Sequence, residues 1–231
     1  MISFDPTKPL ALIGQPFGNY TFFRDVMSQL FGKKFRDLND GAGKLMPSWE
    51  RRSNQMDGTW APEIDCIGGI FDAGAGNCVC RCCPADSQFI LIVADPFATA
   101  VESYRVAKSE SEAGQFWIQG KQSHVDEHFR SIDEFLEQFP RSIYDHLPTE
   151  LALDNFQKQF SQRYVHVGLA DTPKQSAEHI AAAVGRHIRT MPDLPPVDQT
   201  ASLPEHLRKQ FEHNLPLPSR IYQFAKDSVA A

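Results

Sequence analysis

The segment FILIV at residues 89–93 constrains the fold most, because it is five consecutive apolar residues, three of them β-branched. Such a run is typical of a central strand that is buried on both faces. Asp95 and Pro96 follow, and they suit the cap and the first turn of a helix. The inward face of that helix would carry Phe97, Ala100, Val101 and Tyr104.

Two further segments show the same order of a strand followed by a helix. LALI at 10–13 precedes a broad apolar stripe over 20–31, which Gly32 should end. YVHVGL at 164–169 precedes a predicted helix at 173–188, for which Thr172, Pro173 and Gln175 supply a cap, a first-turn proline and a capping-box partner. Three such units predict an α/β fold, a parallel sheet flanked by helices on both faces.

The remaining segments predict further strands, loops and helices around this sheet. Residues 64–71 read as a strand weakened by two glycines, and residues 33–62 as mostly loop with one short strand at 35–38. Ser131 and Glu134 have capping-box spacing for a helix that Pro140 should end, and Ser202 with Glu205 has the same spacing. Further helices are expected at 149–162, 203–213 and 219–228, with a proline-rich connection at 191–199. We expect one domain over 1–231.

Charge and hydropathy exclude several classes of protein. The 231-residue chain has a formal net charge of −6, which disfavours a general nucleic-acid binder. It has no apolar run near the roughly 20 residues that cross a bilayer, so no membrane span is expected. Its first residues, MISFDPTKPL, lack the basic and apolar regions of a secretory signal. We therefore expect a cytoplasmic protein.

The parallel sheet predicts where a ligand would bind. Ligands of such sheets lie beyond the carboxyl ends of the strands, which places loops 14–21 and 94–96 at one mouth. The first loop, within GQPFGNYTFF, leads into a helix whose N-terminus favours anions. Gly18 allows close approach and Thr21 offers a hydroxyl. The Walker pattern is absent, so a plain connection between core elements is an alternative interpretation.

The order of motifs resembles that of the Golgi-type and bacterial sulfotransferases, which transfer a sulfuryl group from 3′-phosphoadenylyl sulfate (PAPS). The similarity is strongest at FILIVADPFATAVESY (89–104), RYVHVGLAD (163–171) and SRIYQFAK (219–226). It implies a P-loop NTPase-like sulfotransferase architecture. It also implies a nucleotide sulfate donor and an acceptor hydroxyl on a small molecule or glycan.

Aligned with this family, the first loop would form the PAPS-binding segment. The family's lysine is Phe17 here, the arginine before Asp95 is Ala94, and the helical serine is Glu102, with Ser103 adjacent. Loss of charged contacts predicts weaker PAPS binding. A catalytically inactive relative that binds a ligand or partner is therefore the alternative. The resemblance implies the following cofactor-binding residues: Phe17, Gly18, Asn19, Tyr20, Thr21, Phe22 and Ser103.

Basic and acidic residues elsewhere could complete such a site. Basic side chains that could reach the mouth are Arg24, Lys44, Arg51 and Arg52. Carboxylates in a plausible region for a general base are Glu50, Glu63, Asp65 and Asp72. No spacing distinguishes one of these carboxylates from the others.

Histidines and cysteines offer an alternative kind of site, one that would bind a metal or form redox pairs. His124 and His128 have i,i+4 spacing that suits a metal, although an exposed polar face is favoured. The cluster CVCRCC contains Cys78, Cys80, Cys82 and Cys83. It could bind zinc or form redox pairs, but buried thiols on a strand are the favoured interpretation. We expect no metal.

Overall fold

The computed structural model describes residues 1–15, 19–39, 55–56, 59–60, 63–71, 79, 83–114, 117–118, 121–122, 124–138, 147, 151–194 and 205–230. Its centre is a five-stranded sheet with the order β2-β5-β1-β6-β9, in which every neighbouring pair is parallel. The strands are β1 (Leu10–Gly14), β2 (Phe35–Asp37), β5 (Cys66–Ile70), β6 (Gln88–Val93) and β9 (Tyr164–Leu169). The α/β parallel sheet predicted from the sequence is confirmed.

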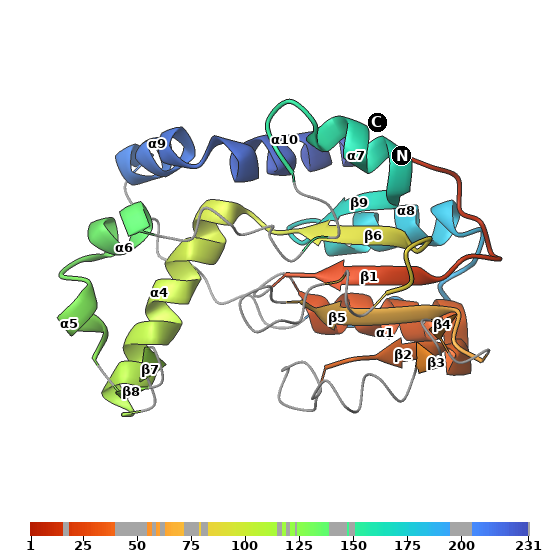
Figure 1. The fold of residues 1–231 in the computed structure, drawn as a ribbon, viewed down its shortest axis with the longest axis horizontal. Coiled ribbons are helices and arrows are strands. Elements are labelled where there is room, and N and C mark those ends of the chain that lie inside the picture. Colours follow the sequence, from red (N-terminus) through yellow and green to blue (C-terminus); the bar gives the residue numbers. More distant parts are fainter. Residues whose placement is uncertain are drawn as a thin grey trace.

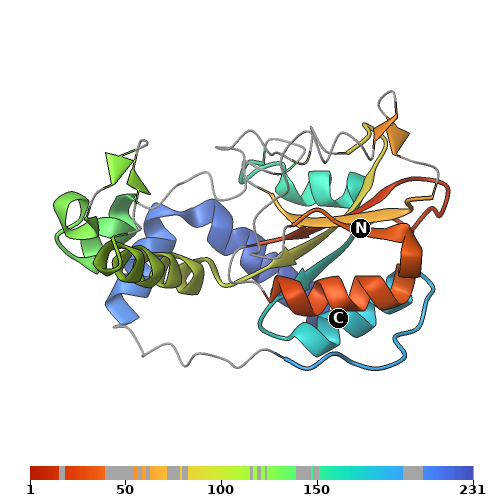
Figure 2. The same ribbon diagram turned by 90° about the horizontal axis from the view of Figure 1, so that it is seen from below.

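Helices cover both faces of this sheet (Figures 1 and 2). α1 (Tyr20–Phe31) and α8 (Pro173–Ala183) pack on one face, and α7 (Phe156–Arg163) and α10 (Pro216–Ala230) on the other. Successive strand side chains alternate between the faces. In β6, Ile90 and Ile92 pack in the core under α1 and α8, whereas Leu91 and Val93 pack in the core under α7 and α10. Because both faces of β6 are buried, FILIV is apolar throughout.

A third, smaller core lies beside the sheet, at the left of Figure 1. It is formed by α4 (Pro96–Glu112), α6 (Ile132–Gln138) and α9 (Glu205–Asn214), with the short α5 (Val125–His128) against α4. Phe97 and Phe211 meet edge to face at its centre, with ring centroids 5.6 Å apart. The minor elements are η1 (Gly32–Lys34), β3 (Gln55–Met56), β4 (Thr59–Trp60), β7 (Trp117–Ile118) and β8 (Lys121–Gln122).

Most predicted boundaries agree with the structure. Asp95 caps α4 by accepting hydrogen bonds from the N–H groups of Phe97 and Ala98, at 2.9 and 3.3 Å. Ser131 accepts the Glu134 N–H at the start of α6, and Gly32 ends α1. Pro140 and Ser202 lie outside the described residues. Tyr104 is only half-buried and packs against Phe135 rather than in the sheet's core.

Two helix predictions are wrong in extent. The helix expected over 149–162 begins at Phe156, because the Asn155 side chain accepts the Ala152 N–H at 2.8 Å and stabilises a turn. The helix expected over 173–188 ends at Ala183, shortly before Gly185 at φ 66°. Thr172 forms no side-chain cap, and the Gln175 amide donates instead to the Val229 carbonyl of α10.

None of the described helices combines the length and apolar character needed to cross a bilayer.

Candidate functional site

The strand order places the topological switch point of the sheet between β1 and β6. The chain leaves β1 toward the edge strand β2 and leaves β6 toward the opposite edge strand β9, so the two connections diverge there. Gln15 lies at this point and is 2% exposed. Its Oε1 accepts the Ala94 N–H at 3.0 Å, which joins the loops after β1 and β6 as the sequence predicted. Its buried Nε2 has no hydrogen-bond partner within the described part of the chain.

The N-terminus of α1 lies at the same end of the sheet, near the carboxyl ends of β1 and β9. Asn19 is the N-cap and has a left-handed backbone with φ 55°. Its side-chain amide donates to the Ala170 carbonyl at 2.9 Å and so bonds the end of β9 instead of capping the helix. The first turn of α1 contains no acidic residue. The positive end of the helix dipole therefore has neither a side-chain cap nor a carboxylate of its own, an arrangement that favours an anion.

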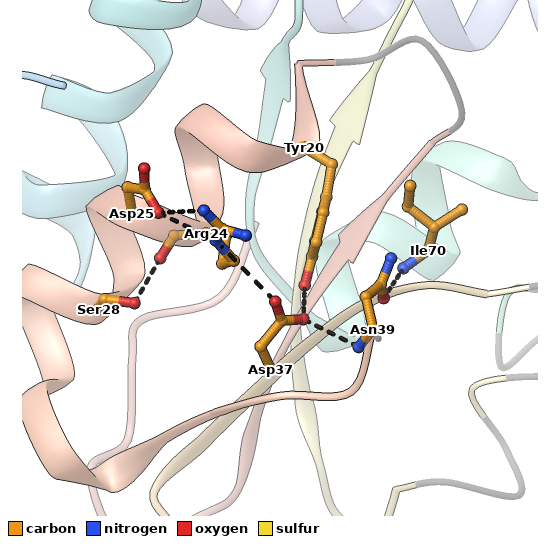
Figure 3. Close-up of polar contacts among 7 residues, drawn as sticks. All are labelled: Tyr20, Arg24, Asp25, Ser28, Asp37, Asn39 and Ile70. Carbon is orange, nitrogen blue, oxygen red and sulfur yellow. Dashed lines mark hydrogen bonds and ion pairs between the residues drawn. The ribbon is translucent and has the colours of Figure 1, made fainter. Parts of the chain in front are cut away.

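Tyr20 is the first residue of α1, and its side chain extends from the end of β1 toward Asp37 of β2 (Figure 3). Its hydroxyl donates to Asp37 Oδ1 at 2.7 Å, across the middle of β5, where Asp37 pairs with Gly68. Gly68 of β5 leaves room for this hydroxyl, since a Cβ there would lie 2.9 Å from Tyr20 Oη. Burial, and then the negative charge of Asp37, raise the pKa of Tyr20 far above its usual range. Tyr20 therefore stays protonated and acts as a hydrogen-bond donor.

The same view shows that Arg24 is already paired. Its guanidinium binds Asp25 Oδ1 at 2.8 and 2.9 Å, and Arg24 Nε lies 4.0 Å from Asp37 Oδ2. Asp37 Oδ1 also accepts the Asn39 N–H at 3.0 Å, and Asn39 Oδ1 accepts the Ile70 N–H at 3.0 Å. Arg24 is therefore held among carboxylates and is not a free cation for the mouth.

The helices near the C-terminus bring two more side chains to carboxylates at the strand ends. Arg208 of α9 binds Asp95 Oδ2 at 2.8 Å, and its guanidinium lies 4.6 Å above the centre of the Phe97 ring. The Tyr222 hydroxyl of α10 donates to Asp171, which follows β9. Partial burial, and then repulsion from Asp95, raise the pKa of Asp171 despite the hydrogen bond from Tyr222.

The residues predicted to bind a cofactor do not all lie at the mouth. Asn19 and Tyr20 lie at the mouth, and Thr21 is exposed. Phe22 is 1% exposed and packs in the core under α1. The Ser103 hydroxyl donates to the Thr99 carbonyl within α4. Phe17 and Gly18 lie outside the described residues.

The other candidate acids and bases are distributed over the molecule. Asp65 pairs with Lys34 at 3.0 Å, Glu63 is exposed, and Glu102 faces Arg105 at 3.5 Å. His124 Nδ1 lies 3.1 Å from Ser111 Oγ, whereas His128 packs against Phe129. The candidates that lie outside the described residues are Lys44, Glu50, Arg51, Arg52 and Asp72.

The cysteines are described only in part. Cys66 and Cys83 are buried free thiols, and burial raises the pKa of Cys66 well above its usual value. Cys78, Cys80 and Cys82 lie outside the described residues. No group of three or more potential metal ligands occurs among the residues that are described.

Sequence reasoning missed Gln15, Arg208 and the pairing of Asp171 with Tyr222. Asp171 and Tyr222 each fall in segments that the family resemblance singled out, but nothing local indicates that they meet. Arg208 has only an i,i+4 relation to Glu212, which is 3.7 Å away and typical of a solvated helix face.

No family model matches the chain, and no curated protein matches it. Among solved structures, it is similar to the crystal structure of mouse sulfotransferase SULT7A1 complexed with PAP. The TM-score is 0.48 and the identity 11%, over 90% of this chain and 63% of that one. The chain thus spans less than two thirds of that protein's length.

Proposed function

We propose that this chain is a sulfotransferase-like protein that binds PAPS at the N-terminus of α1 and transfers its sulfuryl group to a hydroxyl of a small molecule or glycan. The observation that carries the proposal is Gln15, whose Nε2 is buried without a partner among the described residues, beside an α1 N-terminus that lacks a side-chain cap. A buried donor without an acceptor costs free energy. A phosphate or sulfate oxygen would satisfy it.

Among the described residues, the proposed binding energy comes mainly from neutral donors. The helix N-terminus contributes its dipole and backbone N–H groups, and Gln15 contributes an amide. At the mouth, the guanidinium of Arg208 is committed to Asp95 and that of Arg24 to Asp25. We therefore expect PAP, the desulfated nucleotide, to bind in the micromolar range rather than more tightly.

A second candidate function, a catalytically inactive relative that binds a ligand or a partner, is favoured by the carboxylates at this edge. Asp37 is the last residue of β2, and Asp95 and Asp171 come two residues after the ends of β6 and β9. Negative charge at three strand ends opposes a nucleotide that carries several phosphate and sulfate charges. This alternative predicts no PAPS turnover and weak or absent binding of PAP.

Titration calorimetry with PAP, and with adenosine as an uncharged control ligand, separates the two candidates. The wild type should bind PAP but not adenosine at micromolar concentration. Gln15→Ala should weaken PAP binding about tenfold, equivalent to about 1.4 kcal/mol. Gln223→Ala, a change of an exposed α10 glutamine, should leave it unchanged.

The outcomes are distinct. Failure of the wild type to bind PAP would contradict the proposal. PAP binding without transfer of radioactive sulfur from labelled PAPS would leave the inactive relative as the function. The proposal includes a cytoplasmic location, which cell fractionation tests.

A further inference from the structure

We propose that Asp171, oriented by Tyr222, accepts the proton of the acceptor hydroxyl during sulfuryl transfer. This inference rests on the proposed function, because it assigns a residue to the same site. It assigns the role to a carboxylate outside the four acidic residues that sequence reasoning placed near the mouth.

Asp171 is adjacent to the proposed anion site. The preceding residue, Ala170, accepts the hydrogen bond from the Asn19 side chain, with Nδ2 and the carbonyl oxygen 2.9 Å apart. Asn19 is the N-cap of α1, where the sulfuryl end of the donor would bind. The backbone that carries Asp171 is therefore fixed to the edge of the helix that would hold the reacting group.

The Tyr222 hydroxyl fixes the orientation of the Asp171 carboxylate. It donates to Oδ2, while Oδ1 has no hydrogen-bond partner within the part of the chain that the structure describes. The Asp171 side chain is only partly covered by its neighbours, which leaves room for a substrate hydroxyl to approach Oδ1. One oxygen is thus positioned and the other is available, which is the arrangement required of a general base.

The charged groups around Asp171 come from three elements. Asp95 after β6 repels its charge, whereas Lys226 of α10 and Arg208 of α9 attract it. Partial burial opposes the charged form and is the largest effect, so the pKa is raised overall. A raised pKa makes the ionised carboxylate a stronger base than an ordinary aspartate.

The two other carboxylates that the structure describes at this edge already have partners. Asp95 uses Oδ1 for the N–H groups of Phe97 and Ala98 and Oδ2 for Arg208. Asp37 Oδ1 accepts from Tyr20 and Asn39, and its Oδ2 faces Arg24. Asp37 also lies at an edge strand, two strands away from β1. Asp171 is therefore the best placed of the three.

In the proposed step, the acceptor oxygen forms a bond to sulfur as its proton moves to Asp171 Oδ1. The bond between sulfur and the phosphate oxygen of PAPS breaks, and its electron pair stays on the leaving PAP. Asp171 then returns the proton to solvent.

The test measures sulfuryl transfer from PAPS to phenol, n-hexanol and N-acetylglucosamine as probe acceptors, from pH 5 to pH 9, alongside calorimetry with PAP. Asp171→Asn should lower turnover about 100-fold or more, the usual range for a general base, with PAP affinity unchanged or higher because a negative charge is removed. Asp171→Glu should restore part of the rate. Asp193→Asn, at an exposed aspartate outside the site, is the matched control and should behave as the wild type.

A pH profile distinguishes a base from a purely structural residue. The wild-type rate should rise with pH through the raised pKa of Asp171 and then level off. Tyr222→Phe removes a hydrogen bond that lowers that pKa, so its rising limb should move to higher pH. Thermal melts of each variant check that the fold is retained.

Three results would overturn the inference. If Asp171→Asn keeps turnover within about threefold of wild type, or loses PAP affinity by the same factor as turnover, Asp171 is not the base. If the wild type binds PAP but transfers sulfur to none of the probes, the base role fails while PAP binding stands. If the wild type does not bind PAP, the proposed function fails as well.

Discussion

Gly14, the last residue of β1, lies directly against the ring of Tyr20: a Cβ at residue 14 would come within 2.3 Å of Tyr20 Cδ2. The ring of the first α1 residue therefore packs where the strand ends, with its hydroxyl directed to Asp37. The close approach of strand and helix at the candidate site depends on the missing side chain at residue 14.

Gly14→Ala should destabilise the protein, because the new methyl group must displace a buried ring. We expect a loss of about 1–3 kcal/mol in the free energy of unfolding, measured by urea denaturation. In a Tyr20→Ala background the same change should cost much less, since the clash is gone. Equal costs in both backgrounds would show that the two residues do not interact.

Tyr20→Phe should lower the free energy of unfolding by about 1–3 kcal/mol, because the partly buried Asp37 loses the Tyr20 hydrogen bond. Tyr164→Phe is the matched control. Its buried hydroxyl has no partner among the described residues, so removing it should be neutral or stabilising. Urea denaturation of both variants tests the contrast, and equal losses would count against it.

His166 should make stability depend on pH. Burial, and then repulsion from His179, lower its pKa to about 4 from an ordinary value of 6.5. Between these values the unfolded chain binds a proton that the folded protein does not, so stability falls as pH decreases from 6.5 to about 4. The full loss is about 3 kcal/mol.

Replacing His166 by glutamine should flatten the dependence of the unfolding free energy on pH over that window. His187→Gln, at an exposed histidine, should retain the wild-type slope. The measurement is urea denaturation at several pH values, and an unchanged slope in His166→Gln would refute the assignment.

Arg208→Met should cost about 1–2 kcal/mol of unfolding free energy, because it removes the ion pair with Asp95 and the stacking on Phe97. A double-mutant cycle with Asp95→Asn should give a positive coupling energy that decreases in high salt. Arg220→Met, at an exposed arginine of α10, serves as the control and should change stability little. Zero coupling would show that the pair contributes nothing.

Local patterns predicted the elements well where a single segment carries the signal. The apolar run at 89–93, the cap at Asp95 and the stripe over 20–31 each specify their own structure, and the structure agrees. The helix ends near residues 155 and 185 were missed, because the Asn155 side chain and a left-handed Gly185 stop the helices at points that apolar periodicity does not mark.

The amino-acid sequence by itself determined the five strands of the main sheet and most helices, since these depend on neighbouring residues and on the rules for parallel sheets. It also predicted the end of the strands at which we propose that a ligand binds. Only the tertiary structure decided which side chains meet there. Asn19 and Ala170 are 151 residues apart, and Asp95 and Arg208 are 113 apart. Such contacts arise from the packing of whole elements, so no local pattern in the sequence encodes them.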